Sequence, residues 1–150
     1  MWKYDHLSEW VIAPPRIRNV RSGSSKSSNL TFSTLSHVEF QVIREAFYAA
    51  GKKRVPAALD LSPFALAVWF MDDGSKKSKR CRGVYFNTQS FDSESIEILR
   101  NKLSDRFEVD STIRMQKDGM QIYIPSRSIR RLVDLLEPFV IPCMRYKLPN

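Results

Sequence analysis

The sequence holds little of the chemistry that builds disulfide frameworks, zinc sites or membrane spans. Its two cysteines, Cys81 and Cys143, lie far apart and indicate a reducing compartment rather than a disulfide framework. His6 and His37 have no Cys or His neighbours at zinc spacing, so we assign them no metal role. No apolar run approaches membrane-spanning length, and the N-terminus lacks the basic-then-apolar pattern of a secretory signal. We therefore expect a protein that is not secreted and has no membrane partner.

Acidic residues are missing from two long stretches of the chain. Lys and Arg number 24 against 16 Asp and Glu, which gives a formal net charge of +8. No acid interrupts residues 10–38 or 74–91, and both stretches carry several Lys and Arg among Ser or Gly. Flexible basic loops of this kind track phosphates, so nucleic acid is the first partner to consider. The alternative is a basic surface that serves solubility alone.

The most informative segment is Leu-Ala-Val-Trp-Phe-Met-Asp-Asp-Gly at residues 66–74. Ser62 is a good N-cap, and the apolar residues that follow predict a buried helix over 62–73 with Gly74 as a left-handed cap. The helix ends on Asp72 and Asp73, although the C-terminal end of a helix carries partial negative charge. Two carboxylates there suggest a hard metal ion bound by oxygen. The alternative is a core helix that ends in a solvated acidic turn.

The pattern along the chain predicts helices and hairpins in a repeating order. With 43% hydrophobic residues the chain can bury a core. Helices are predicted at 4–12, 36–49, 62–73, 92–107 and 128–137, the fourth of them with Asp92 as its N-cap. Hairpins are predicted at 16–35, 76–90 and 109–125. The helix, hairpin, helix order of 4–56 recurs at 93–149, which indicates an internal repeat with units 1–60 and 61–150. The second unit has a further helix and hairpin in front, so we expect that roughly thirty residues, including a second motif helix, are absent from the front of the first unit.

Polar and apolar side chains alternate in the predicted hairpins, as in strands with one buried and one solvent face. In the first hairpin, Arg16 and Arg18 alternate with Ile17. In the second, Tyr85, Asn87 and Gln89 alternate with Val84 and Phe86. In the third, Arg114 and Gln116 alternate with Ile113 and Met115. Arg, Asn and Gln are the side chains that pair bidentately with guanine and adenine edges in the major groove. The polar face of any antiparallel sheet would look similar.

These motifs resemble the LAGLIDADG homing endonucleases, whose motif is similar to residues 66–74. The resemblance continues in Phe-Asn-Thr-Gln-Ser-Phe at 86–91, Ile-Tyr-Ile-Pro-Ser at 122–126, and Ile-Pro at 141–142 through Tyr-Lys-Leu-Pro-Asn at 146–150. It also includes Trp-Val at 10–11, Pro-Pro at 14–15 and Lys-Lys-Arg-Val-Pro at 52–56. It covers nearly the whole chain and is closest to the monomeric, two-motif enzymes encoded in organellar rRNA introns.

The resemblance implies an α+β fold in which each half is α-β-β-α-β-β-α. Two motif helices pack side by side, a contact that Ala65 and Ala67 would suit, and the antiparallel sheets form a saddle over double-stranded DNA. The implied localisation is a mitochondrion, a chloroplast or the bacterial cytoplasm. Because one motif is not found in this chain, we expect a missing first half or a dimer partner across helix 62–73. Without that partner, an apolar stripe that includes Trp69 or Phe70 should be exposed.

The resemblance also implies a mechanism in which Asp73 binds Mg²⁺ between the scissile phosphates. Asp72 matches the neighbouring motif position and could assist as a metal ligand. Lys147 and Lys53 match the basic residues near the active site in the two halves. The expected DNA-binding residues are Arg16, Arg18, Arg21, Lys76, Lys77, Lys79, Arg80, Arg82, Asn87, Gln89, Arg114, Gln116 and Lys117.

Three functions follow as expectations. The first is a site-specific, metal-dependent DNA endonuclease, whose cleavage of both strands by the lone chain is in doubt. The second is an intron RNA maturase or a remnant that binds nucleic acid without cutting. The third is a basic structural protein with no role on nucleic acid.

Overall fold

A computed structural model of the chain describes residues 1–22, 25–78 and 81–149, and of residues 21, 22 and 25–27 it describes the backbone alone. The chain forms two compact units, Met1–Ile43 and Arg44–Asn150, so that the boundary lies inside helix α2 (Val38–Phe47). No helix of the described residues is both long and apolar enough to cross a bilayer.

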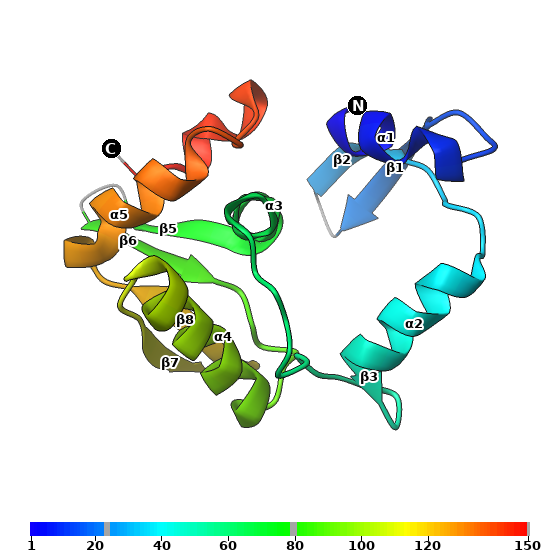
Figure 1. Cartoon of the computed structure of the whole chain (residues 1–150). Helices are drawn as coiled ribbons and strands as arrows, with labels where there is room; N and C mark the ends of the chain where they lie inside the picture. Colours follow the sequence, from blue (N-terminus) through cyan, green and yellow to red (C-terminus); the bar gives the residue numbers. More distant parts are fainter. Residues whose placement is uncertain (23–24, 79–80, 150) are drawn as a thin grey trace. The chain divides into compact units, whose positions relative to one another are not determined.

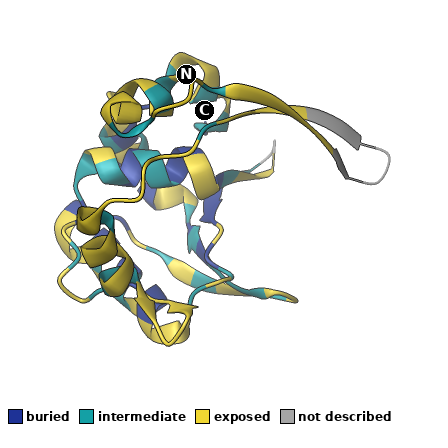
Figure 2. Cartoon of the chain, turned by 90° about the vertical axis from the view of Figure 1, so that its right-hand side faces the viewer, coloured by how far each residue is buried: buried dark blue, intermediate teal, exposed yellow. Residues whose placement is uncertain are grey.

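The first unit has little buried surface. Helix α1 (Trp2–Leu7) leads into a 3₁₀ turn (Ser8–Trp10), in place of the single helix predicted for 4–12. The predicted hairpin is confirmed as β1 (Arg16–Ser22) paired with β2 (Ser25–Thr31). Its predicted half-burial is wrong: Ile17 is 74% exposed, and the described side chains of both strands are exposed (Figure 2). Two strands alone have no second layer to cover either face.

The second unit begins with the end of α2 and a two-residue ladder of β3 (Tyr48–Ala49) and β4 (Lys52–Lys53). The predicted helix 36–49 is therefore shorter, because the chain turns into β3 after Phe47. Downstream, Val55 is buried, and its N–H donates to Ser95 Oγ at 2.8 Å.

The rest of the second unit has the expected α-β-β-α-β-β-α order (Figure 1). Its elements are α3 (Pro63–Asp73), β5 (Gly74–Ser78), β6 (Cys81–Phe86), α4 (Ser93–Phe107), β7 (Thr112–Gln116), β8 (Gly119–Ile124), α5 (Ser126–Leu136) and a 3₁₀ segment (Pro142–Lys147). All strand pairs are antiparallel in the order β5-β6-β8-β7, and α3, α4 and α5 pack against the sheet.

The core lies between this sheet and its helices. Strand residues facing the helices are fully buried together with the apolar sides of the helices, in a set that includes Leu66, Phe70, Val84, Phe86, Ile96, Leu103, Ile122, Ile124, Leu132 and Leu136. Alternation in β8 follows the two-residue period, because Ile122 and Ile124 face the core while Gln121 and Tyr123 face the other way. Met115 departs from its predicted inward position and is 71% exposed near the end of β7.

Side-chain caps fix the starts of helices α3 and α4. Ser62 Oγ accepts from the Ala65 N–H at 3.1 Å, and Asp92 Oδ1 accepts from the Ser95 N–H at 2.8 Å, so both predicted N-caps are confirmed. The two hydrogen bonds from Ser95 hold the pKa of the Asp92 carboxyl below its ordinary value.

Candidate nucleic-acid interface and catalytic centre

Helix α3 delivers the motif carboxylates to its C-terminal end, and both Asp72 and Asp73 are exposed there. The expected exposed stripe needs correction. Phe70 is fully buried and packs edge-on against Phe86 at 5.7 Å, while Trp69 is half-buried over the same ring at 4.1 Å. Ala67 is also fully buried, so it cannot face a neighbouring motif helix.

Gly74 joins this helix directly to β5, and its predicted left-handed conformation is wrong. Its φ of −74° and ψ of 142° are extended. The residue is required for close packing instead: a Cβ at this position would lie 2.4 Å from both the ring and the carbonyl oxygen of Phe70. The strand therefore leaves the helix without an intervening loop, which keeps the carboxylates at the junction of α3 and the sheet.

Lys147 is brought to the same helix end from the C-terminal 3₁₀ segment. Its ammonium donates to the carbonyl oxygens of Met71 at 2.6 Å and Asp72 at 3.2 Å. A cation here offsets the negative end of the helix dipole. The structure thus brings together Lys147, Asp72 and Asp73, three of the four residues assigned to catalysis and metal binding.

Lys53 lies elsewhere in the second unit, exposed on β4. It lines a cavity of about 750 Å³ together with Lys52, Asp92 and Glu94 at the start of α4. Its predicted catalytic role stays a prediction.

Asn87 contacts the end of α3 from the loop that follows β6. Its backbone N–H and its side-chain amide both donate to the Asp73 carbonyl oxygen, at 3.0 and 2.8 Å. Sequence reasoning placed this residue on a DNA-reading strand, whereas β6 ends one residue earlier, at Phe86. The carbonyl contact depends on two segments meeting in space and has no local sequence signal.

The donors at this helix end suit a hard divalent ion. Among the described residues no group of three His, Cys, Asp or Glu side chains is placed to hold a metal. Mg²⁺, however, is commonly bound by one or two carboxylates and completes its shell with waters and substrate phosphates. The exposed carboxylates of Asp72 and Asp73 fit that mode, and they are oxygen ligands of the preferred kind.

The face of the four-stranded sheet turned away from the helices carries cations over a tyrosine pair. Tyr85 and Tyr123 are cross-strand partners with ring centroids 5.1 Å apart. The Lys77 ammonium lies 4.9 Å from the Tyr123 ring centre, and the Arg114 guanidinium lies 5.0 Å from that of Tyr85. Arg114 also donates to the Tyr85 hydroxyl. These contacts orient both cations on one surface, as a phosphate- or base-contacting face requires.

The other expected DNA-binding residues differ in their exposure and in the element that carries them. Gln116 is half-buried on the same outer face as Arg114, and Lys117 is exposed in the adjoining turn. Gln89 is half-buried, and its backbone lies so close to Gly119 that a Cβ there would be 2.5 Å from the Gln89 carbonyl oxygen. Exposed positions at the β5–β6 hairpin and in the first unit are Lys76, Arg82, Arg16 and Arg18. Lys79, Arg80 and the side chain of Arg21 lie outside the described residues.

Fold and site together define an α+β domain with a carboxylate-bearing helix end beside a cationic antiparallel sheet. A model of the LAGLIDADG DNA endonuclease family matches residues 1–132, and this chain belongs to that family.

Individual relatives agree with this assignment. Probable intron-encoded endonuclease 1 of Wickerhamomyces canadensis is 32% identical, over 95% of this chain and 65% of that protein. Cytochrome b mRNA maturase bI2 of Debaryomyces hansenii is 33% identical, over 91% of this chain and 53% of that protein. The chain thus spans between about half and two thirds of these relatives.

A solved structure confirms the predicted fold class. The homing endonuclease I-WcaI bound to its DNA recognition sequence superposes with a TM-score of 0.87 at 30% identity, over 97% of this chain and 68% of that one.

Proposed function

We propose that this chain belongs to a site-specific, metal-dependent endonuclease of the homing type that hydrolyses phosphodiester bonds in duplex DNA. The observation that carries the proposal is the junction of α3 and the sheet. There Asp72 and Asp73 are exposed at the end of α3, and the Lys147 ammonium contacts the carbonyl oxygens of Met71 and Asp72. Negative oxygen donors, a cation and a basic sheet face are the parts that phosphate chemistry on DNA requires.

Asp73 is proposed as the principal metal ligand and Asp72 as its assistant. When Mg²⁺ is bound, it supplies an activated water and offsets negative charge on the leaving oxygen. Lys147 holds the helix end through carbonyl oxygens and is proposed to stabilise the charge that develops on the phosphate. Lys53, which belongs to the first half of the predicted repeat (residues 1–60), is proposed as the counterpart of Lys147.

The outer sheet face is proposed to bind the duplex. Lys77 suits a phosphate, since an ammonium is a point charge, whereas Arg114 and Gln116 suit base edges in the major groove. The exposed lysines and arginines of the two hairpins add phosphate contacts that position the DNA without reading its sequence.

A second motif helix is proposed to pack on the side of α3 that faces away from the core. Ala65 and Val68 are half-buried on that side, and Ala65 is small enough for close helix packing. Sedimentation at rising protein concentration tests for pairing between two copies, which Val68→Glu should weaken. A chain that stays monomeric would instead favour a helix from another segment or another protein.

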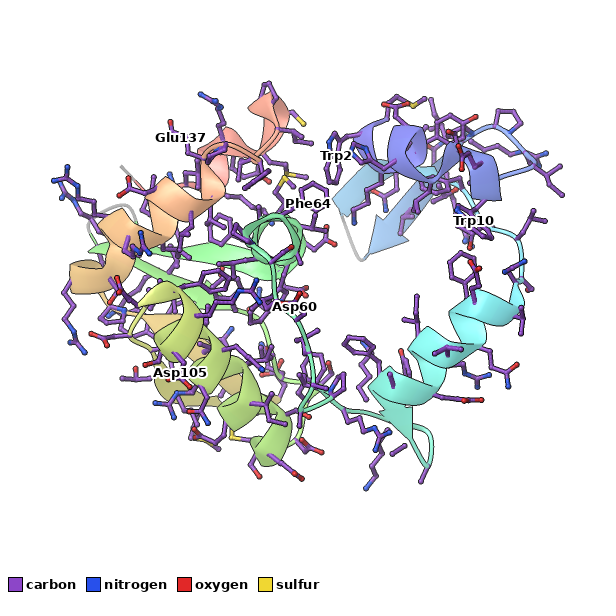
Figure 3. All side chains as sticks on the ribbon, in the orientation of Figure 1. Trp2, Trp10, Asp60, Phe64, Asp105 and Glu137 are labelled. Carbon is purple, nitrogen blue, oxygen red and sulfur yellow. The ribbon has the colours of Figure 1, made fainter. Side chains whose placement is uncertain are left out.

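The experiment that tests the endonuclease proposal starts by selecting bound duplexes from a randomised DNA library. The selected duplex is then incubated with the chain and Mg²⁺, and strand breaks are counted. Asp73→Asn should retain binding and lose cleavage by about 100-fold or more, because a neutral amide is a poor metal ligand. Asp105→Asn is the matched control, since Asp105 is an exposed acid on α4 (Figure 3). Equal cleavage by Asp73→Asn, or no Mg²⁺-dependent break with the unaltered chain, would contradict the proposal.

The second candidate function is an RNA maturase, which the match to the Debaryomyces hansenii maturase favours. The same cationic sheet would then bind structured intron RNA rather than duplex DNA. A splicing assay of Asp73→Asn with several candidate introns distinguishes the maturase from the endonuclease. Splicing that needs the protein and tolerates this substitution would support the maturase and count against metal-dependent cleavage.

A further inference from the structure

Three side-chain amides form a hydrogen-bonded chain that ends at the motif helix. Gln116 Nε2 on β7 donates to Gln121 Oε1 on β8 at 3.2 Å, and Gln121 Nε2 donates to Asn87 Oδ1 at 2.6 Å. Asn87 Nδ2 in turn donates to the Asp73 carbonyl oxygen at 2.8 Å. The chain therefore links two strands of the sheet to the last residue of α3.

The direction of this chain is fixed by its last member. A backbone carbonyl can accept but not donate, so Asn87 must present its NH₂ group to Asp73. Its side-chain oxygen then faces Gln121, which must present its own NH₂ group, and the same logic orients Gln116. Reversing any one amide would place two acceptors or two donors face to face. Amides aligned head to tail also polarise one another, which strengthens each bond.

The first two members lie on the surface proposed to bind DNA. Gln121 is the cross-strand partner of Arg114, and Gln116 follows two residues later on the same face of β7. Asn87 lies beyond the end of β6 and belongs to the helix junction. The amide chain thus runs from the outer sheet face to the backbone of the proposed metal ligand.

We propose that Gln121 is a positioning residue, which holds Asn87 and through it the Asp73 backbone in the orientation needed for metal binding and cleavage. The proposal rests on the endonuclease function proposed above. Without Gln121 the Asn87 amide can rotate, and one of the two donors to the Asp73 carbonyl is no longer fixed. Misplacement of a catalytic group by 1 Å can cost about 100-fold in rate.

The test compares Gln121→Met with Gln41→Met, which makes the same chemical change at an exposed position of α2. Methionine preserves length and volume but removes the donor and the acceptor. The first readout is the NMR signal of the Asn87 side-chain NH₂ group in the chain alone, which should shift and exchange faster with water. The second is the Mn²⁺ concentration at which the signals next to Asp73 reach half of their maximal broadening. This concentration should rise severalfold. The third is cleavage of the selected duplex with the protein saturated by DNA, where kcat should fall about 10-fold.

Gln121→Glu provides a second variant if the first does not fold, because a carboxylate retains the shape but cannot donate to Asn87. Unchanged Asn87 side-chain signals in the folded variant would overturn the inference, whether or not the chain cleaves DNA. So would altered signals accompanied by unchanged Mn²⁺ affinity and kcat. Failure of the unaltered chain to bind Mn²⁺ near Asp73 or to cleave would instead overturn the endonuclease proposal, and the inference, which rests on it, would fall with it.

Discussion

Lys147→Met is the substitution that most directly tests how the end of α3 is held. It removes an ammonium that donates to the Met71 and Asp72 carbonyls at 2.6 and 3.2 Å, and it keeps an apolar stem of similar length. Hydrogen bonds that involve a charged group contribute about 1.5–3 kcal/mol each, and a cation at a helix C-terminus about 0.3–1 kcal/mol. Because Lys147 is half-buried, solvent screening reduces these values. We expect the free energy of unfolding to fall by about 1–2 kcal/mol, and Tm by roughly 4–10 °C.

The same substitution should change metal affinity in the opposite direction. Removing a positive charge beside Asp72 and Asp73 favours a divalent cation, so Mn²⁺ should bind severalfold more tightly at low ionic strength. Cleavage should nevertheless fall, because the cation proposed to stabilise phosphate charge is lost.

Urea denaturation followed by circular dichroism measures the stability, and Mn²⁺ line broadening measures the affinity. Lys102→Met on α4 is the control, and it should leave both quantities near those of the unaltered chain. Stability equal to that of the control would show that the two carbonyl contacts do not hold the helix end. Weaker Mn²⁺ binding with the helix intact would refute the electrostatic reasoning.

Three further predictions concern neighbouring parts of the unit. Gly74→Ala should lower the free energy of unfolding by about 1–3 kcal/mol in urea, because the new methyl group would overlap Phe70. The lowered pKa of Asp92 means that its stabilising contribution is present above the ordinary value of 3.8 and is lost as the pH falls through the lower folded value. Unfolding curves between pH 2 and 7 should therefore show a weaker acid dependence in Asp92→Ala. Lys77→Ala should reduce the slope of log Kd for duplex DNA against log salt by about 1, whereas Arg114→Ala should relax the base preference at one position of the selected site.

Sequence reasoning succeeded where structure is decided locally. The caps at Ser62 and Asp92 need one side chain and a backbone N–H three residues later, so the pattern alone predicts them. The strand alternation that placed Arg114 and Gln116 on one face follows from the two-residue period. Tyr123 and Gln121 occupy the same face of β8 for the same reason, and the pattern Met-Gln-Ile-Tyr-Ile could have identified them.

Sequence reasoning failed where one residue type serves two physical purposes, or where segments far apart in the sequence meet in the fold. Glycine after a helix usually means a left-handed cap, but Gly74 is extended and is needed because Phe70 leaves no room for a Cβ. Phe70 was expected at an open surface because a helix apolar on every side cannot reveal which side faces its own sheet. Contacts such as Lys147 with Met71 join residues 76 positions apart and leave no periodic trace in the sequence.

The contacts at the end of α3 explain how two carboxylates are tolerated where the helix dipole disfavours them. The last carbonyl groups of a helix lack partners within the helix and normally turn to solvent or to a cap. Here the Met71 and Asp72 carbonyls accept from Lys147, and the Asp73 carbonyl accepts twice from Asn87. Donors that come from two later segments of the chain are thus directed at backbone oxygens, while the carboxylate side chains extend to the exposed surface. The partial negative charge of the helix end is offset by these donors to its backbone oxygens. It follows that a helix end held at its backbone and exposed acidic residues are compatible at this position.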